Sequence, residues 1–415
     1  METPVVRRGT RIAVVGINYA PETSGIAPYT TEMCEFLAST GADVTVITGV
    51  PHYPEWRVTH GYDPKKVTIE TIDQVRIIRV PHYVPPVQSV KNRARYEASF
   101  LANGLRATRN IDADMVIGIT PALADGVIAA RLAHRLSVPF GMIIQDLMGA
   151  AASQSGISGG SRVARLTGRL ERSTVSRADR IAVIAPGFSR ALVRQGIPAE
   201  SIDWLRNHSH VTASSKTTAQ AREALGWPEG KYLVVHTGNQ GMKQGLENVI
   251  EAARLMPTES AVQFILVGDG NQRSKLEREA EGLDNVTFVD PLSEAVYPDA
   301  LAAADVLLMN ERPGVVDMSL PSKLTSYFAA GRPVVAAVSP AGETAHELER
   351  AGTTAIVASG APAELAQLLD DLATGRRDCT ADAAAGKAYA DAQLSRDAAR
   401  TRLLAFIDSL AASRP

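Results

Sequence analysis

Short runs of apolar, β-branched residues recur along the first half of the chain and alternate with stretches of helical periodicity. The runs are five or six residues long, a length typical of buried strands in a parallel sheet. Helices are predicted at 26–39, with Gly41 as the stop signal, and at 123–136. This alternation predicts a doubly wound parallel sheet with both faces covered. The predicted strands are 12–16, 43–48, 75–80, 115–119, 140–144 and 180–184.

The same alternation begins again after a polar stretch, 207–230, that is broken by Ser, Thr, Gly and Pro. We therefore expect two Rossmann-like domains, 1–207 and 208–385, and a C-terminal helix at 386–415 that is a candidate for packing back on the first domain. Such domains bind ligands at the carboxyl ends of their strands, here facing a cleft between the domains. The second set of strands is 232–236, 262–267, 286–289, 305–309 and 333–338, and its helices are 245–255, 275–280 and 322–330.

The composition is that of a soluble globular chain. Of 415 residues, 45% are hydrophobic and 21% charged, which argues against a disordered or fibrous protein. The formal net charge of −2 leaves no basic surplus for nucleic acid, so we expect no nucleic-acid partner. No apolar run approaches the roughly 18–20 residues of a spanning helix, and none resembles a signal-peptide core. Cys34 and Cys379 lie too far apart in sequence to suggest a disulfide framework or a metal site. A cytoplasmic protein is expected.

The segment TGNQGMKQG (237–245) predicts a phosphate-binding loop between a strand and a helix. Its glycines allow close backbone approach, and the start of the helix offers free N–H groups to an anion. Lys243 adds a positive charge to this loop. The alternative is a tight turn with Lys243 in water. The candidate contacts beside Lys243 are Asn239, Gln240 and Gly241.

The segment LPSKLTSYFAAG (320–331) places Ser322 and Lys323 in the first turn of a predicted helix. A cation there opposes the helix dipole unless an anion is bound. Lys323 either points into water or joins Lys243 in a pyrophosphate clamp, and two lysines at two helix starts favour the clamp.

Two further loops follow predicted strands. VGDG (267–270) is either an ordinary turn or, through Gly268, Asp269 and Gly270, one wall of a nucleotide site. GINYAPETSG (16–25) contributes Asn18 and Gly25 as candidate contacts from the first domain. It lacks the GxGxxG fingerprint, which disfavours a nicotinamide-dependent dehydrogenase.

Polar and aromatic residues at other strand ends complete the candidate set. Asp146 ends the strand at 140–144 and is either a functional carboxylate or a residue that fixes its loop. His52 and Trp56 lie in PHYPEW, an aromatic loop suited to sugar stacking or to rigid packing. Asp112 and Asp114 precede a strand, so we expect a solvated turn and no metal site there.

Together these segments resemble the retaining GT-B glycosyltransferases of family 4, over nearly the whole chain. The opening, from GINYAPETSG to PHYPEW, is similar to the branch that builds colanic acid and related exopolysaccharides. TGNQGMKQGLENVIEAARL, FILVGDGNQRSKLE and MSLPSKLTSYFAAGRPVVAA are similar to the donor-domain motifs of that branch. The expected fold class is therefore α/β, of the GT-B type.

The resemblance implies a nucleotide diphospho-sugar donor and a transfer with retention. Because helix dipoles with Lys243 and Lys323 can stabilise a leaving diphosphate, we expect neither metal nor cofactor. The expected acceptor is a glycan or a lipid-pyrophosphate. Lys243 matches the diphosphate-binding lysine, whereas Asn239 stands where many members have arginine. Pro291 and Leu292 match the base-lining segment. Many members also carry two glutamates, whose places are taken here by Met318 and Ser326. Glu311 and Asp317 are the nearby acidic candidates for contacting the donor.

The charge distribution bears on the acceptor and on competing functions. The first 210 residues carry a net charge of +6, and segments 88–109 and 159–180 each carry +4. Such helices suit peripheral contact with the inner face of a membrane, or form a solvated surface. The alternatives to a transferase are a nucleotide-sugar epimerase of the same architecture and a non-catalytic nucleotide-sugar-binding protein. The aromatic loop and the basic segments favour the transferase.

Overall fold

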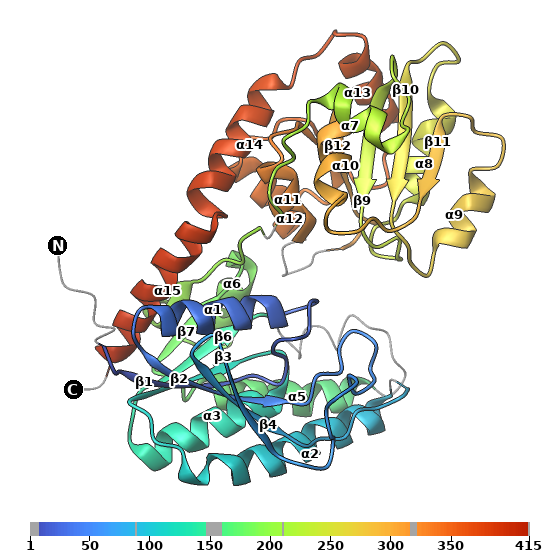
Figure 1. Cartoon of the computed structure of the whole chain (residues 1–415). Helices are drawn as coiled ribbons and strands as arrows, with labels where there is room; N and C mark the ends of the chain where they lie inside the picture. The colour runs from blue at the N-terminus through green and yellow to red at the C-terminus, as the bar shows by residue number, and fades with distance from the viewer. Residues whose placement is uncertain (1–7, 88, 147–159, 210, 316–321, 414–415) are drawn as a thin grey trace. The chain divides into compact units, whose positions relative to one another are not determined.

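The computed structural model divides the chain into two compact units (Figure 1). It describes residues 8–87, 89–146, 160–209, 211–315 and 322–413, with the side chains of 160–167 left out. Unit 1 comprises Met1–Asn207 and Ala399–Pro415, and unit 2 comprises His208–Ala398. The chain therefore leaves unit 1, builds unit 2 and returns to unit 1.

Unit 1 is built on an eight-stranded sheet in the order β3-β4-β2-β1-β5-β6-β7-β8, parallel except for β3. Helices α1 and α15 lie over one face, and α2, α3 and α5 over the other (Figure 1). The strands are β1 (Arg11–Val15), β2 (Asp43–Gly49), β3 (Thr68–Ile72), β4 (Val75–Val80), β5 (Met115–Ile119), β6 (Phe140–Ile144), β7 (Arg180–Val183) and β8 (Ile202–Trp204). The helices are α1 (Ala27–Ser39), α2 (Val90–Ala107), α3 (Leu123–Leu136), α5 (Gly160–Val175), α6 (Pro186–Arg194) and α15 (Arg396–Ala411).

Unit 2 is built on a six-stranded, fully parallel sheet in the order β11-β10-β9-β12-β13-β14. The strands are β9 (Tyr232–Thr237), β10 (Val262–Val267), β11 (Val286–Val289), β12 (Val306–Asn310), β13 (Val334–Val338) and β14 (Ile356–Ala358). The helices are α7 (Thr218–Leu225), α8 (Glu247–Leu255), α9 (Arg273–Glu279), α10 (Tyr297–Ala303), α11 (Ser322–Ala329), α12 (Glu343–Arg350), α13 (Pro362–Ala373) and α14 (Thr380–Gln393).

The central strands of each sheet are buried on both faces, which explains why they are continuous apolar runs. In β9, Leu233 and Val235 face one core cluster while Val234 faces the other. The parallel sheets confirm the doubly wound α/β prediction.

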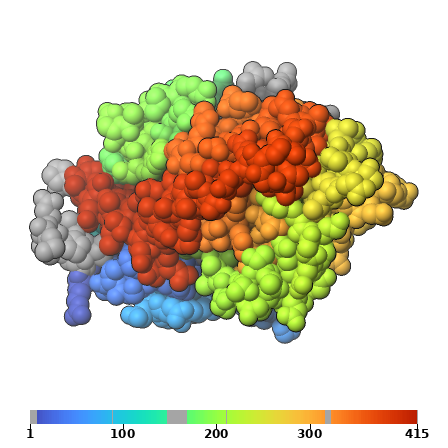
Figure 2. All heavy atoms as spheres, turned by 90° about the horizontal axis from the view of Figure 1, so that it is seen from above, coloured from blue at the N-terminus to red at the C-terminus, as the bar shows by residue number. Residues whose placement is uncertain are grey.

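The C-terminal helix α15 completes the core of unit 1. Leu403, Phe406 and Leu410 pack in the same cluster as residues of β1, β2 and β5. Gly141 of β6 makes room for them, because a Cβ there would lie 2.9 Å from Leu410 and 3.0 Å from Phe406. Helices α14 and α15, red in the space-filling view, are both visible at the surface (Figure 2).

The structure differs from the sequence-based elements in several regions. The polar stretch 207–230, predicted as a broken linker, contains α7, whose first turn has a capping box between Thr217 and Gln220. The predicted tail 386–415 is divided between the units, because Ala390 and Leu394 pack in a core cluster of unit 2. Strands β3, β8 and β14 and helices α6, α10, α12 and α13 were not predicted.

Candidate functional site

In unit 2, the register of the sheet brings three predicted loops side by side. Thr237 of β9 pairs with Val267 of β10, and Val267 pairs with Val289 of β11. The residues that follow are Gly238, Gly268 and Asp290. Gly238 N donates to Val267 O at 2.9 Å, and Gly268 N donates to Val289 O at 2.9 Å. The carboxyl ends of three adjacent strands therefore form one continuous loop layer.

The glycines of this layer serve loop packing. Gly268 has φ +132°, and a Cβ there would lie 2.0 Å from the carbonyl oxygen of Gly238. A Cβ at Gly270 would lie 2.6 Å from the carbonyl carbon of Gln240. Only glycine fits at these two contacts. Gly238, with φ +108°, is different, because the nearest atoms around its missing Cβ are Cε and Nζ of Lys323, at 3.7 and 3.8 Å.

Gln240 is a structural residue, which corrects its prediction as a substrate contact. Its side chain is fully buried and donates to the carbonyl oxygens of Leu266 and Gly268, at 3.3 and 3.2 Å. Its backbone N–H donates to Asp269 O, and its carbonyl accepts from Gln272 N. Since no part of the side chain reaches the surface, Gln240 fastens the 237–245 loop to the 267–270 loop.

Lys323 lies beside this layer, partly buried. Its Nζ is 3.4 Å from Nε2 of His236, whose Nδ1 lies 3.2 Å from Leu308 O. Burial lowers the pKa of Lys323 to about 8, and the charge of Glu311 opposes this shift. Burial, together with the Lys323 charge, lowers the pKa of His236 well below its usual value, so the imidazole is neutral. The structure thus contradicts the alternative in which Lys323 extends into water.

Glu311 is buried behind this lysine. It follows β12, and its carboxylate accepts a hydrogen bond of 2.7 Å from Thr344 Oγ1. The carboxylate therefore balances the charge of Lys323 from the protein interior.

Most remaining predicted contacts of unit 2 lie at the surface. Lys243 is exposed on a loop anchored by the 2.9 Å hydrogen bond from Arg312 N to Lys243 O. Gly241 is buried against the side chain of Asn239, and Leu292 packs partly on the core. Asp317 lies outside the described residues. The exposed candidates are Asn239, Asp269, Pro291 and Ser322.

Sequence reasoning missed the hydroxyl groups and the arginine that brace these loops. Thr237 N donates to the hydroxyl of Tyr327 at 2.9 Å, and Thr237 Oγ1 lies 3.0 Å from the hydroxyl of Tyr297. Arg273 donates to Gly268 O at 2.7 Å and pairs with Asp290 at 2.8 Å. Tyr327 lies within the 320–331 segment, but its partner becomes known only when α11 is placed against β9.

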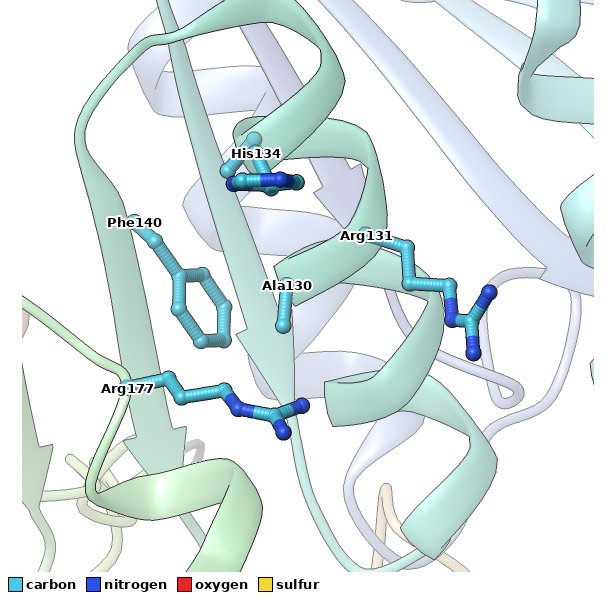
Figure 3. A pocket seen from close by; sticks show the side chains of 6 residues that line it. Ala130, Arg131, His134, Phe140 and Arg177 are labelled. Carbon is cyan, nitrogen blue, oxygen red and sulfur yellow. The ribbon is translucent and has the colours of Figure 1, made fainter.

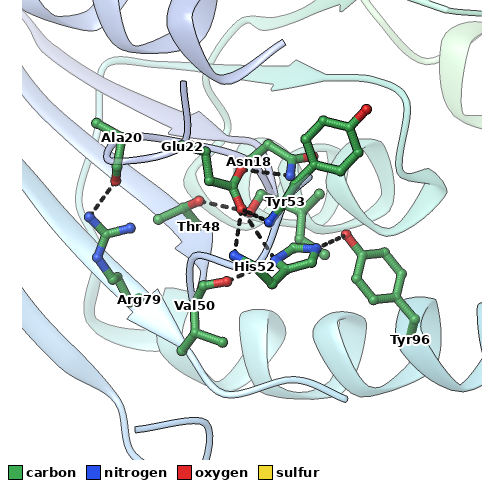
Figure 4. Close-up of polar contacts among 10 residues, drawn as sticks. Asn18, Ala20, Glu22, Thr48, Val50, His52, Tyr53, Arg79 and Tyr96 are labelled. Atoms are coloured by element: carbon green, nitrogen blue, oxygen red, sulfur yellow. Dashed lines mark hydrogen bonds and ion pairs between the residues drawn. The ribbon is translucent and has the colours of Figure 1, made fainter. Parts of the chain in front are cut away.

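In unit 1, a buried carboxylate joins the loops that follow β1 and β2. Glu22 Oε1 accepts from the backbone N–H groups of His52 and Tyr53, at 2.8 and 2.9 Å. Glu22 Oε2 accepts from Asn18 Nδ2 at 2.8 Å. Arg79 of β4 holds the same loop by donating to Ala20 O at 2.6 Å (Figure 4). Glu22, Tyr53 and Arg79 were not among the sequence candidates.

The ring of His52 is fully buried, which corrects its prediction as a surface for sugar stacking. It packs against His82 and Tyr96, and its Nε2 lies 3.2 Å from the Tyr96 hydroxyl. Burial lowers the pKa of His52 and lowers that of His82 to about 3, so both rings are neutral. Trp56 is only half-buried and lies 5.5 Å from His52, centroid to centroid. The buried ring of His52 therefore packs against the inner side of the half-buried Trp56.

Two other predicted residues of unit 1, Gly25 and Asp146, lie in loops that follow β1 and β6. Gly25 is exposed with φ +66°, and a Cβ there would lie 3.1 Å from the ring of Tyr53. Asp146 is half-buried, and its backbone is fixed by Thr120, whose Oγ1 donates to Asp146 O at 3.1 Å. One residue earlier, Gln145 exchanges side-chain hydrogen bonds with Asn207, the last residue of this part of unit 1.

The Asp112 and Asp114 turn is held by Arg11, which forms ion pairs with both carboxylates. The turn is exposed, as predicted, but it is ion-paired to β1. Among the described residues no group of three or more His, Cys, Asp or Glu side chains is arranged to hold a metal ion. No helix in the described part of the chain is long and apolar enough to cross a bilayer.

Each unit contains a hollow. One, of about 640 Å³ in unit 1, is lined by Phe140, Arg177 and His134, near the amino end of β6 (Figure 3). The other, of about 500 Å³ in unit 2, lies between Met242, Arg312 and Pro362. Met242 and Gly245, both in the 237–245 loop, connect the second hollow to the loop layer.

Comparison with known proteins matches both units to transferase domains. Residues 24–208 match the glycosyl transferase 4-like domain, and residues 231–374 match the glycosyl transferases group 1 domain. The chain is 35% identical over 337 residues to WcaI of Escherichia coli K12, a glycosyl transferase assigned to colanic acid biosynthesis, covering 77% of this chain and 81% of WcaI.

Two further comparisons extend this result. The chain is 26% identical over 301 residues to a GDP-mannose-dependent alpha-mannosyltransferase of Mycobacterium tuberculosis, covering 72% of each protein. Its structure is similar to that of Anabaena HepE in complex with UDP-glucose, with a TM-score of 0.64, 16% identity and coverage of 97% of this chain and 99% of HepE. This last likeness concerns the fold, and solved glycosyltransferases such as WaaG, with a TM-score of 0.62, share it.

Proposed function

The chain belongs to the glycosyl transferases that join a 4-like domain to a group 1 domain in a GT-B fold, and from this premise we propose that it moves a sugar from a nucleotide diphospho-sugar to a glycan or lipid-linked acceptor. Unit 2 binds the donor in this proposal, and unit 1 binds the acceptor. The curated relatives are transferases, which favours this reaction over the nucleotide-sugar epimerase and the non-catalytic binding protein.

The observation that carries the proposal is the position of Lys323 beside Gly238. Gly238 is exposed, and the space on its Lys323-facing side is open. At Gly268 and Gly270 the corresponding space is occupied by a neighbouring loop. A diphosphate at this point would meet an ammonium group from α11 and backbone N–H groups from the loop after β9. Lys243, exposed on the same loop, would add a second charge.

The chemistry of transfer would depend on stabilising the leaving nucleoside diphosphate. Oriented N–H groups and two lysines supply positive charge where negative charge develops. We therefore propose a metal-independent reaction, and retention as in the resembling family. Asp146, held by Thr120 at the carboxyl end of β6, is the proposed catalytic carboxylate of unit 1.

The acceptor is proposed to be a lipid-pyrophosphate-linked or other glycan, reached by peripheral contact with a membrane. Val87 and Val90 at the start of α2 are 66% and 48% exposed, and Lys91 beside them is exposed as well. Arg169 and Leu170 present a similar pair on α5. Exposed apolar side chains flanked by cations suit an anionic lipid surface.

The test is thermal stabilisation by UDP-, GDP- and dTDP-sugars, because a ligand that prefers the native state raises its melting temperature. One nucleotide series should stabilise the wild type and fail to stabilise Lys243→Ala. Lys387→Ala is the matched control, since it removes an exposed lysine of α14 that pairs with Asp391. A folded wild type that no nucleotide stabilises would overturn the proposal.

A further inference from the structure

Glu22 connects loops 18–25 and 50–56 of unit 1, which carry the exposed Gly25 and the half-exposed rings of Tyr53 and Trp56. Beyond the base of the loops, where Gly49 N donates to Ile17 O, the described hydrogen bonds between loops 18–25 and 50–56 all end on its carboxylate. The side chain is only 1% exposed, so these bonds are shielded from water. The carboxylate sets the position of one loop relative to the other.

Removal of the carboxylate would act on Tyr53 and Trp56 first. Glu22 accepts from the backbone N–H of Tyr53, and the ring of Tyr53 lies 6.1 Å from that of Trp56, edge to face. The ring of Tyr53 also lies against Gly25, where a Cβ would be 3.1 Å from it. Trp56 itself has φ +52°, a conformation that L residues adopt only when their surroundings hold them. The buried carboxylate therefore fixes the segment that carries both half-exposed rings, while His52 and Tyr96 contact Trp56 directly.

A carboxylate suits this position better than a neutral side chain. Hydrogen bonds from N–H donors to an ionised acceptor are about twice as strong as neutral ones. His52, 3.3 Å away at Nδ1, is kept neutral by burial, so the three N–H donors carry the stabilisation of the negative charge. Glutamine would keep the two backbone bonds but would turn an NH₂ group towards the Asn18 donor.

We infer that Glu22 is a positioning residue, whose carboxylate holds Tyr53 and Trp56 as a platform for a pyranose ring of the acceptor. This inference rests on the proposed function, in which unit 1 binds the acceptor. An aromatic face packs against the C–H face of a sugar, and two rings set at a fixed angle select the orientation of that sugar. Glu22 acts through the rings and does not itself touch the substrate.

The experiment uses Trp56 as its own reporter. The chain has three tryptophans, so Trp204→Phe with Trp227→Phe leaves Trp56 alone in the full-length protein. Methyl and octyl glucosides, galactosides and mannosides are titrated while Trp56 emission is recorded. In this background Glu22→Ala should weaken the saturable response to the best hexoside by about tenfold or more, with Glu22→Gln in between. Stabilisation by the nucleotide should stay as in the wild type.

The control is Asp179→Ala, which removes a carboxylate that accepts from Phe140 N at 2.8 Å, at the opposite end of the strands. An equal loss of hexoside binding in Asp179→Ala would overturn the inference, because general destabilisation would then explain it. Unchanged binding in Glu22→Ala, or no Trp56 response to any hexoside in the Trp56-only protein with Glu22 intact, would overturn it as well. Failure of the donor proposal is seen separately, in the nucleotide series.

Discussion

Substitution of Gly268 by alanine is expected to separate the loops that follow β9 and β10. The new Cβ would lie 2.0 Å from Gly238 O, whereas real Cβ contacts stay beyond 3.0 Å, so one loop must move by more than about 1 Å. The movement would disturb two backbone hydrogen bonds, Gly238 N to Val267 O and Gly268 N to Val289 O. The Lys323-facing side of Gly238 would move with them.

The expected magnitude follows from these contributions. An L residue at φ +132° costs about 1–3 kcal/mol, and each weakened hydrogen bond about 1 kcal/mol. The total is about 4 kcal/mol. For a unit of this size, 1 kcal/mol corresponds to a shift in melting temperature of about 2–4 °C, so the transition of unit 2 should fall by about 8–16 °C.

The assay is differential scanning calorimetry, together with a titration of the stabilising nucleotide. Gly230→Ala is the matched control, because Gly230 also has positive φ (+73°) but has no atom within 4 Å of its missing Cβ. It should lower the melting temperature by only about 2–4 °C and leave nucleotide affinity unchanged. Equal losses in the two variants would refute the reasoning, since backbone conformation alone would then account for both.

Three other outcomes are expected. Burial lowers the pKa of Lys323 to about 8, and a bound anion favours its charged form, so nucleotide affinity should fall as pH rises through 8. Titration calorimetry in two buffers of different ionisation enthalpy should show that the protein takes up protons on binding nucleotide at pH 8–9. An affinity that does not change with pH would contradict the placement of the anion beside Lys323. Phe406→Ala should destabilise unit 1 by about 3–5 kcal/mol in urea unfolding, while an unchanged midpoint would mean that α15 is dispensable. Transferase activity should survive EDTA and Asp114→Asn alike, and loss of turnover in either would argue for a metal.

Most strands were predictable because they are runs of apolar residues, and the central ones, such as β9 and β10, are buried on both faces. Residues 286–289 were predicted with the bounds of β11. Strand β3, an edge strand that pairs only with β4, has exposed and half-exposed positions throughout and gives no such signal. Helix α7 carried a readable capping box, but its polar surroundings suggested a linker.

The candidate site was predictable in place more than in detail. Parallel strands end at one edge, which placed the 237–245 and 267–270 loops on the same side of the sheet, and the pairing of β9 with β10 makes them neighbours. Whether the space at a glycine is filled by another loop or left open depends on three-dimensional packing, as the nearest-atom distances of 2.0 Å at Gly268 and 3.7 Å at Gly238 show. Glu22 and the Tyr327 hydroxyl were missed because each acts through a backbone group far away in sequence.

The return of α15 to unit 1 has a consequence for synthesis on the ribosome. The residues that fill the core of unit 1 beside Gly141 are translated only after all of 208–398 has been made. Unit 2 can therefore reach its complete fold first, which reverses the usual order in which the N-terminal domain matures ahead of the next. A chain truncated before Phe406 would leave the core of unit 1 incomplete and unit 2 intact.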